Sequence, residues 1–101
     1  MLEHNDAVTI APHLHKIIFE NERMRLLEVT VKPGERAEMH SHPENIVYIL
    51  TPGTLRFTNQ NNESKDVTFK IGDTTYAKAT THAVENIGNT ELQAIQLEFK
   101  F

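Results

Sequence analysis

The feature that most constrains the fold of this chain is the regular alternation of short apolar runs with turn-forming residues. Pro-Gly pairs predict turns at residues 32–35 and 51–54, an asparagine-rich stretch predicts a hairpin tip at 59–63, and glycines mark breaks at 72–73 and 87–90. The runs between these turns are rich in β-branched and apolar residues and cover residues 16–20, 23–31, 46–51, 54–59, 67–71, 74–79, 82–86 and 92–99. Many short strands at this spacing predict an all-β barrel or sandwich. Beyond the first turns, no stretch has convincing helical periodicity.

The length of 101 residues predicts a single domain with one modest core. We expect one domain over residues 1–101, with the strands between about 16 and 99. The first dozen residues are polar and end at Pro12, so we expect residues 1–12 to be loosely ordered. No linker, repeat or low-complexity segment divides the chain.

Charge and composition exclude several functional classes. The formal net charge is −4 and no cluster of Lys and Arg is present, so a nucleic acid or an anionic membrane is not an expected partner. The chain has no cysteine, which excludes disulfides, thiolate metal sites and cysteine nucleophiles. No signal-peptide pattern and no apolar run of membrane-spanning length is present, and the expected location is therefore the cytoplasm.

Two histidines one residue apart, His40 and His42, are the strongest functional signal. On a β-strand, side chains at positions i and i+2 point to the same face, so two imidazoles can bind one ion if the fold supplies a third ligand. Neutral imidazole is a good ligand for Fe, Ni, Cu or Zn, and the expected cofactor is a divalent ion, one of Fe, Ni, Zn, Mn or Cu. The alternative is an exposed strand that carries incidental histidines.

Two segments together resemble the paired motifs of the cupin superfamily, and the resemblance spans roughly residues 23 to 99. The first family motif is a Gly, five residues, His-x-His, a Glu four residues on and a closing Gly; the second is Gly-Asp, a strand, and a His followed four residues later by Asn. The residues that match the first motif are Gly34, His40, His42 and Gly53, and those that match the second are Gly72, Asp73, His82 and Asn86.

This resemblance implies a small double-sheet jelly-roll β-barrel with a mononuclear divalent metal ion inside it. The implied ligands are His40, His42 and His82. The chain departs from the family in having Ile46 where a glutamate ligand is usual, and Glu44 is the alternative carboxylate. We favour the three-histidine set, because Pro43 disturbs the strand geometry between Glu44 and the histidines. The second motif also lacks its usual Pro and Gly before the histidine.

Other residues compete for roles at this site. His13 and His15 share the i, i+2 spacing, but they lack a partner motif and are expected to face solvent at the start of a strand. Tyr48 is expected to point inward, and Tyr48 or Glu44 is the candidate catalytic acid–base or positioning group. The simplest role of Glu98 is on a solvated strand face; a second possibility is that Gln96 and Glu98 approach the pocket together.

Three functions remain open at the level of sequence. The first is a metal-dependent enzyme, of dioxygenase or isomerase type, that acts on a small oxygen-rich molecule such as a diketone, enediol or hydroxy acid. The second is a non-catalytic module that binds a small molecule or a metal. The third is a metal site that only stabilises the barrel. Because a small barrel has exposed sheet edges, we also expect a homodimer.

Overall fold

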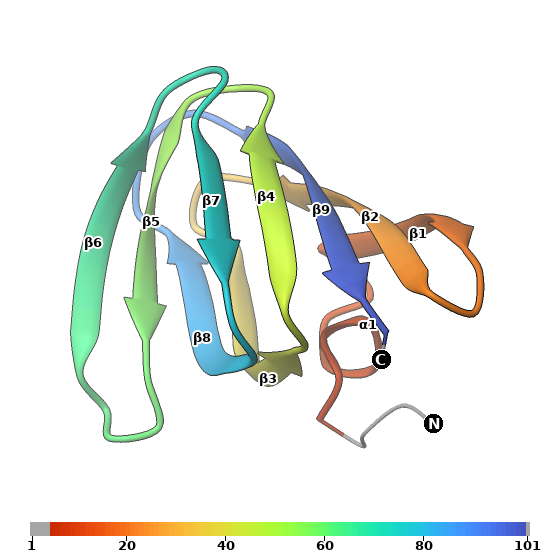
Figure 1. The fold of residues 1–101 in the computed structure, drawn as a ribbon. Helices are drawn as coiled ribbons and strands as arrows, with labels where there is room; N and C mark the ends of the chain where they lie inside the picture. The colour runs from red at the N-terminus through yellow and green to blue at the C-terminus, as the bar shows by residue number, and fades with distance from the viewer. Residues whose placement is uncertain (1–4, 101) are drawn as a thin grey trace.

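The structure, a computed structural model, describes residues 5–100 and consists almost entirely of antiparallel β-strands (Figure 1). Its elements are one short helix, α1 (Ala7–Ile10), and the strands β1 (His15–Glu20), β2 (Met24–Val31), β3 (Arg36–His42), β4 (Asn45–Ile49), β5 (Gly53–Thr58), β6 (Ser64–Phe69), β7 (Thr74–Ala77), β8 (Thr80–Asn86) and β9 (Leu92–Phe99). In the described part of the chain, no helix has the length and hydropathy that a membrane span requires.

The strands form two sheets that face each other. One sheet has five strands in the order β1-β2-β9-β4-β7, and the other has four in the order β3-β8-β5-β6. All pairings within them are antiparallel. The predicted all-β, double-sheet fold is confirmed, but the two sheets do not close into a continuous barrel. The strands β6 and β7 are the edges of the two sheets at the left of Figure 1, and β1 lies at the right.

The turns form where the sequence predicts them, and two of them need glycine. Gly34 and Gly72 have φ angles of +79° and +87°, in the left-handed region that side chains other than glycine rarely adopt. At the second turn, an oxygen of Asp73 accepts a hydrogen bond from the backbone N–H of Lys70 (2.8 Å). The hairpin between β5 and β6 is closed by Asn59, whose side-chain oxygen accepts the backbone N–H groups of two residues in the same loop.

The space between the sheets is lined by the inward-facing residues of both. Strand β9 shows this arrangement most regularly, because buried and partly exposed residues alternate along its whole length. Its buried positions are Leu92, Ala94, Gln96 and Glu98. The hydrophobic cluster continues on the other strands through Val31, Ala37, Ile49, Leu55 and Val84. Two polar side chains of β9 therefore lie in the interior with the apolar ones.

The N-terminal segment, which the sequence led us to expect as loosely ordered, packs against the sheets over residues 5–12. Asp6 begins α1, where its carboxylate accepts the backbone N–H of Val8 (3.0 Å), and it is 5% exposed. Asn5 donates a hydrogen bond from its side chain to Ser41 Oγ on β3 (3.0 Å). Ion pairing of Asp6 with Arg25 explains the order of this segment. Residues 1–4 lie outside the described residues.

Candidate metal centre

Four histidines meet in the interior, from three strands of the two sheets. His40 and His42 lie two positions apart on β3 with ring centroids 4.9 Å apart, and His40 is paired directly with His82 of β8. The ring of His82 lies 4.9 Å from that of His40 and 5.4 Å from that of His42. His15, the first residue of β1, lies 5.3 Å from both β3 rings. The period of two along β3 explains why both of its histidines point inward.

Three of these histidines lie close enough together to hold one metal ion. His15, His40 and His42 are buried, and each offers one ring nitrogen within 4.8 Å of the others. In each of the three, Nδ1 lies against an oxygen: the carbonyl of Ala11 for His15 (3.0 Å), the carbonyl of Glu38 for His40 (2.7 Å) and the carboxylate of Glu98 for His42 (2.6 Å). An Nδ1–H that donates in this way leaves Nε2 as the lone pair that can bind a metal ion.

His40 provides the test of whether a metal ion fits these residues. Its Nε2 is buried and has no hydrogen-bond partner in the described part of the chain. A buried polar atom without a partner is costly, and a metal ion among the three nitrogens would satisfy it. The donor set agrees, because imidazole nitrogen is a good ligand for Zn, Cu, Fe and Ni. The residues present therefore fit a divalent transition-metal ion.

Burial also keeps the rings of His15, His40 and His82 neutral, as ligation requires. Desolvation lowers the pKa of His15 to about 3 and that of His40 to about 4. For His82, desolvation first and then the neighbouring histidines lower the pKa to about 3. Near neutral pH these three imidazoles are uncharged, so a metal ion would not have to displace protons from them.

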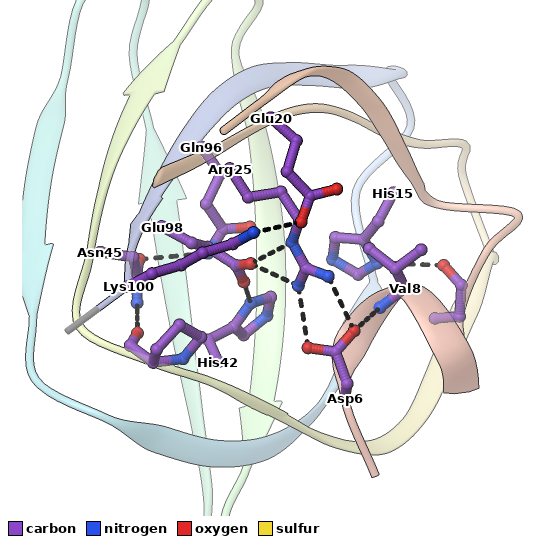
Figure 2. A network of polar contacts seen from close by, with 12 residues as sticks. Asp6, Val8, His15, Glu20, Arg25, His42, Asn45, Gln96, Glu98 and Lys100 are labelled. Atoms are coloured by element: carbon purple, nitrogen blue, oxygen red, sulfur yellow. Dashed lines mark hydrogen bonds and ion pairs between the residues drawn. The ribbon is translucent and has the colours of Figure 1, made fainter. Parts of the chain in front are cut away.

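A buried charged network lies behind His42 (Figure 2). Glu98 accepts a hydrogen bond from His42 Nδ1 through one carboxylate oxygen and binds the Arg25 guanidinium through the other. The same guanidinium donates to both carboxylate oxygens of Asp6, at 2.8 and 3.1 Å. Two carboxylates facing one guanidinium leave an excess of one negative charge, which favours a cation nearby. The contact from carboxylate to histidine is the usual support of a metal-bound imidazole.

A cavity of about 430 Å³ opens beside the histidines, between the two sheets. Its size is in the usual range for small-molecule pockets, so it can hold water or a small ligand.

The structure corrects our interpretation of His15. The sequence led us to expect that His13 and His15 both face solvent; His13 does, but His15 is only 6% exposed and lies in the cluster. The predicted ligands His40, His42 and His82 are brought together, with His15 as an additional member. His82 is half-buried and contacts the β3 rings from β8.

The two candidate acid–base residues lie away from the cavity. The expectation that Tyr48 points inward is wrong, because its side chain is 48% exposed. Glu44 accepts a hydrogen bond from the Tyr76 hydroxyl, and neither residue lines the cavity. Ile46, where the family usually has its glutamate, does not line it either; Asn45 and Val47 do.

Sequence reasoning also missed Arg25 and misjudged Glu98. Glu98 is 1% exposed, so its expected place on a solvated face is wrong. Of the second possibility, an approach of Gln96 and Glu98 to the pocket, the structure shows Gln96 in the cavity lining, whereas Glu98 contacts His42 and does not line the cavity. The available signal was the alternation along β9, which gives Glu98 the same parity as its buried apolar residues. Arg25 gave no comparable signal, because a lone Arg in a strand is usually exposed.

Comparison with known proteins gives the family of this fold. The family model for the cupin domain matches residues 27–97. The chain belongs to the cupin family. A comparison of the sequence with curated proteins gave no match.

Solved cupin structures superpose on most of the chain. A cupin domain from Bordetella pertussis matches with 23% identity and a TM-score of 0.79, over 87% of this chain and 93% of that one. A cupin superfamily protein from Desulfitobacterium hafniense matches with 16% identity and a TM-score of 0.66, over 87% and 77% of the two chains. A predicted oxalate decarboxylase from Thermotoga maritima matches with 25% identity and a TM-score of 0.63, over 86% and 79%.

Proposed function

We propose that this cupin binds one divalent transition-metal ion through its interior histidines and holds a small oxygen-bearing molecule in the adjoining cavity. The observation that carries the proposal is the set of three buried imidazoles with Nδ1 engaged and with one ring nitrogen from each gathered within 4.8 Å. The unpartnered Nε2 of His40 supports it independently. His82, which contacts two of the three rings, is proposed as the further ligand.

The chain's own residues would perform distinct tasks around such an ion. His40 and His42 hold it from β3, and Glu98 orients His42 through the Nδ1–H. A divalent ion bound by neutral histidines supplies a Lewis acid that binds the oxygen of a small molecule. Gln96 lines the cavity on the same face of β9 as Glu98, and its side-chain amide donates to Asn45 Oδ1 (3.1 Å). This pair of amides is placed to orient a polar group beside the metal.

The proposed activity is that of a metal-dependent enzyme of dioxygenase or isomerase type. The second candidate, a non-catalytic small-molecule or metal-binding module, is favoured by one observation: among the described residues, the cavity lining contains no carboxylate and no tyrosine. Proton transfer would then have to use a histidine or a metal-bound group. Oxygen consumption and substrate loss across a panel of diketones and hydroxy acids, with metal-loaded protein, distinguish the two functions.

The metal proposal is tested by elemental analysis of protein purified without added metal. We expect about one ion per chain in the wild type and its loss in His40→Ala and His42→Ala. The matched control is His13→Ala, because His13 is exposed and its ring contacts only the backbone carbonyl of Arg36 (3.1 Å). Unchanged metal content in His40→Ala and His42→Ala would overturn the proposal.

The same assay decides which histidine completes the set. If His15→Ala loses the ion and His82→Ala keeps it, the ligands are the three histidines grouped by their ring nitrogens. The opposite result identifies the set that the family resemblance implies. Loss in both variants indicates a four-histidine site.

A homodimer and a cytoplasmic location remain predictions. The edge strand β1 carries exposed apolar residues at Ile17, Ile18 and Phe19, which are 38%, 44% and 51% exposed. An edge strand of this kind can pair with a second copy of itself. Sedimentation of the wild type and of a Phe19→Lys variant tests the dimer.

A further inference from the structure

The cavity is polar only where it meets the histidines and at its rim. Away from the histidines, its walls are the aliphatic side chains that would otherwise form a closed core, such as Val31, Ile49, Leu55 and Leu92. Two aromatic rings, Phe57 and Phe69, extend this wall on β5 and β6, with centroids 6.3 Å apart. A ligand that fills the space is therefore surrounded mainly by hydrocarbon.

The few polar side chains that line the cavity do not change its mainly apolar character. The side-chain amides of Asn45 and Gln96 bond each other at 3.1 Å. The Thr80 hydroxyl donates to the backbone carbonyl of Lys78 (2.7 Å). Thr75 and Lys65 are exposed on the edge strands β7 and β6, where solvent reaches them. None of these groups offers a polar partner deep in the apolar part of the cavity.

The cavity runs from the histidines toward the open side of the two sheets. His40 and His42 lie on β3, at one edge of the four-stranded sheet, and β6 forms the opposite edge. Three strand spacings separate these edges, or about 14 Å at roughly 4.8 Å per strand. Val67 and Phe69 of β6 line the cavity at this second edge, as do Thr75 and Ala77 of β7, a free edge of the other sheet. The space is thus long in one direction, with the metal-binding nitrogens near one end.

From this arrangement we infer that the ligand of the site is amphiphilic: one oxygen headgroup, such as a carboxylate, at the histidines, and an apolar body that extends toward β6. The inference rests on the proposed metal site for the headgroup, while the apolar body follows from the cavity walls alone. A polar or charged tail would lose its hydration against Leu55, Val67 and Phe69 without gaining a hydrogen bond. An apolar tail releases water from a poorly hydrated surface.

The test is a titration of zinc-loaded protein, with zinc content first measured, against acetate, butyrate, hexanoate and octanoate by calorimetry. We expect the affinity to rise about two- to fourfold for each added methylene. Adipate is the matched control for hexanoate, because it has the same number of carbons and a second carboxylate at the far end. We expect adipate to bind at least tenfold more weakly than hexanoate. Equal affinity for the two, or no dependence on chain length, would overturn the inference.

Two variants on β6 test whether the apolar chain of the ligand lies at that end of the cavity. Val67→Phe fills the far end of the cavity, whereas Thr68→Phe places the same ring on the exposed outer face of the same strand. We expect Val67→Phe to weaken octanoate binding at least tenfold and to leave acetate binding unchanged, and Thr68→Phe to change neither. If Val67→Phe does not fold, Val67→Thr keeps the volume and is expected to weaken octanoate alone. Equal octanoate affinity in the wild type and the Val67 variant would contradict the placement of the ligand's apolar chain beside β6.

The failure of this inference is distinguishable from failure of the metal proposal. If the protein holds no zinc, the metal proposal fails, and the titration is repeated with metal-free protein. A rise in affinity from hexanoate to octanoate in that protein, lost in Val67→Phe, still supports an apolar body in the cavity. If the protein holds one zinc ion per chain but its affinity for the carboxylates does not depend on their chain length, the metal proposal stands and the amphiphilic ligand is excluded.

Discussion

Replacing Arg25 by methionine should destabilise this protein far more than replacing any exposed arginine. The side chain of Arg25 is 2% exposed and binds two buried carboxylates, those of Asp6 (7% exposed) and Glu98 (1% exposed). In Arg25→Met both carboxylates lose their cationic partner while they stay buried. Removing one partner of a buried ion pair typically costs about 3–5 kcal/mol, because the remaining charge is uncompensated.

For a chain of this size, 1 kcal/mol corresponds to roughly 4–8 °C in Tm, so Arg25→Met should lower the Tm by about 12 °C or more. Urea unfolding followed by far-ultraviolet circular dichroism measures the change in free energy. The matched control is Arg56→Met, because Arg56 also binds a carboxylate in bidentate fashion, that of Asp66, at 2.8 and 3.1 Å. That pair is about half exposed, so we expect little change in the control.

The reasoning is refuted if Arg25→Met and Arg56→Met unfold at the same urea concentration. A second variant separates charge from packing. Removing both charged partners, in Arg25→Met combined with Glu98→Leu, should recover part of the lost stability, because one fewer uncompensated carboxylate remains buried. If the double variant is less stable than Arg25→Met by as much as an independent second substitution would cost, the effect of Arg25→Met reflects lost packing of the long side chain and not uncompensated charge.

Three further predictions concern the site and the turns. Glu98→Gln should weaken metal binding about 10- to 100-fold, because the oxygen that orients His42 loses its charge; competition with a chromophoric chelator measures this, and an unchanged affinity would exclude the supporting role. In metal-free protein, His15, His40 and His82 protonate only near pH 4 or below, whereas in the unfolded chain they protonate from about 6.5. The free energy of unfolding should therefore fall as the pH drops from 6.5 toward 4, and an equal or higher urea midpoint at pH 5 than at pH 7.5 would contradict the burial argument. Gly53→Ala should cost about 1–3 kcal/mol of stability, because a Cβ there would lie 3.1 Å from two side-chain atoms of Leu92. Thermal unfolding measures this cost, and an unchanged Tm would mean that Leu92 moves aside freely.

The strand pattern was predictable from sequence where apolar residues alternate with polar ones. Strand β9 and the hairpin tip at 59–63 follow such local rules, and both are where the sequence predicts them. Strand β3 was absent from the predicted apolar runs, because its inward residues near the site are histidines and its outward residues, apart from Met39, are polar or charged. A strand whose buried face carries histidines in place of apolar residues lacks the hydrophobic signal of an ordinary strand.

The site was predictable only where its residues belong to one of the two sequence motifs. His40 and His42 owe their common face to the period of a single strand. His15 depends instead on the docking of the N-terminal segment, which is set by the contact between Asp6 and Arg25 and leaves no local pattern. Tyr48 was misplaced because it shares parity with Ile46, at the usual glutamate position of the family, and Ile46 does not line the cavity. Strands β3 and β4 belong to different sheets, and Asn45, not Glu44, begins the inward set.

The charged network has a consequence for the order in which the protein is made and folds. Its two ends are far apart in the chain: Arg25 and Glu98 are separated by 73 residues, and His42 and Glu98 by 56. During synthesis from the N-terminus, Arg25 and His42 therefore exist long before the carboxylate that joins them. A chain interrupted before β9 contains the four histidines of the cluster but lacks Glu98, which orients His42. Tight metal binding would thus mark chains that have completed their last strand.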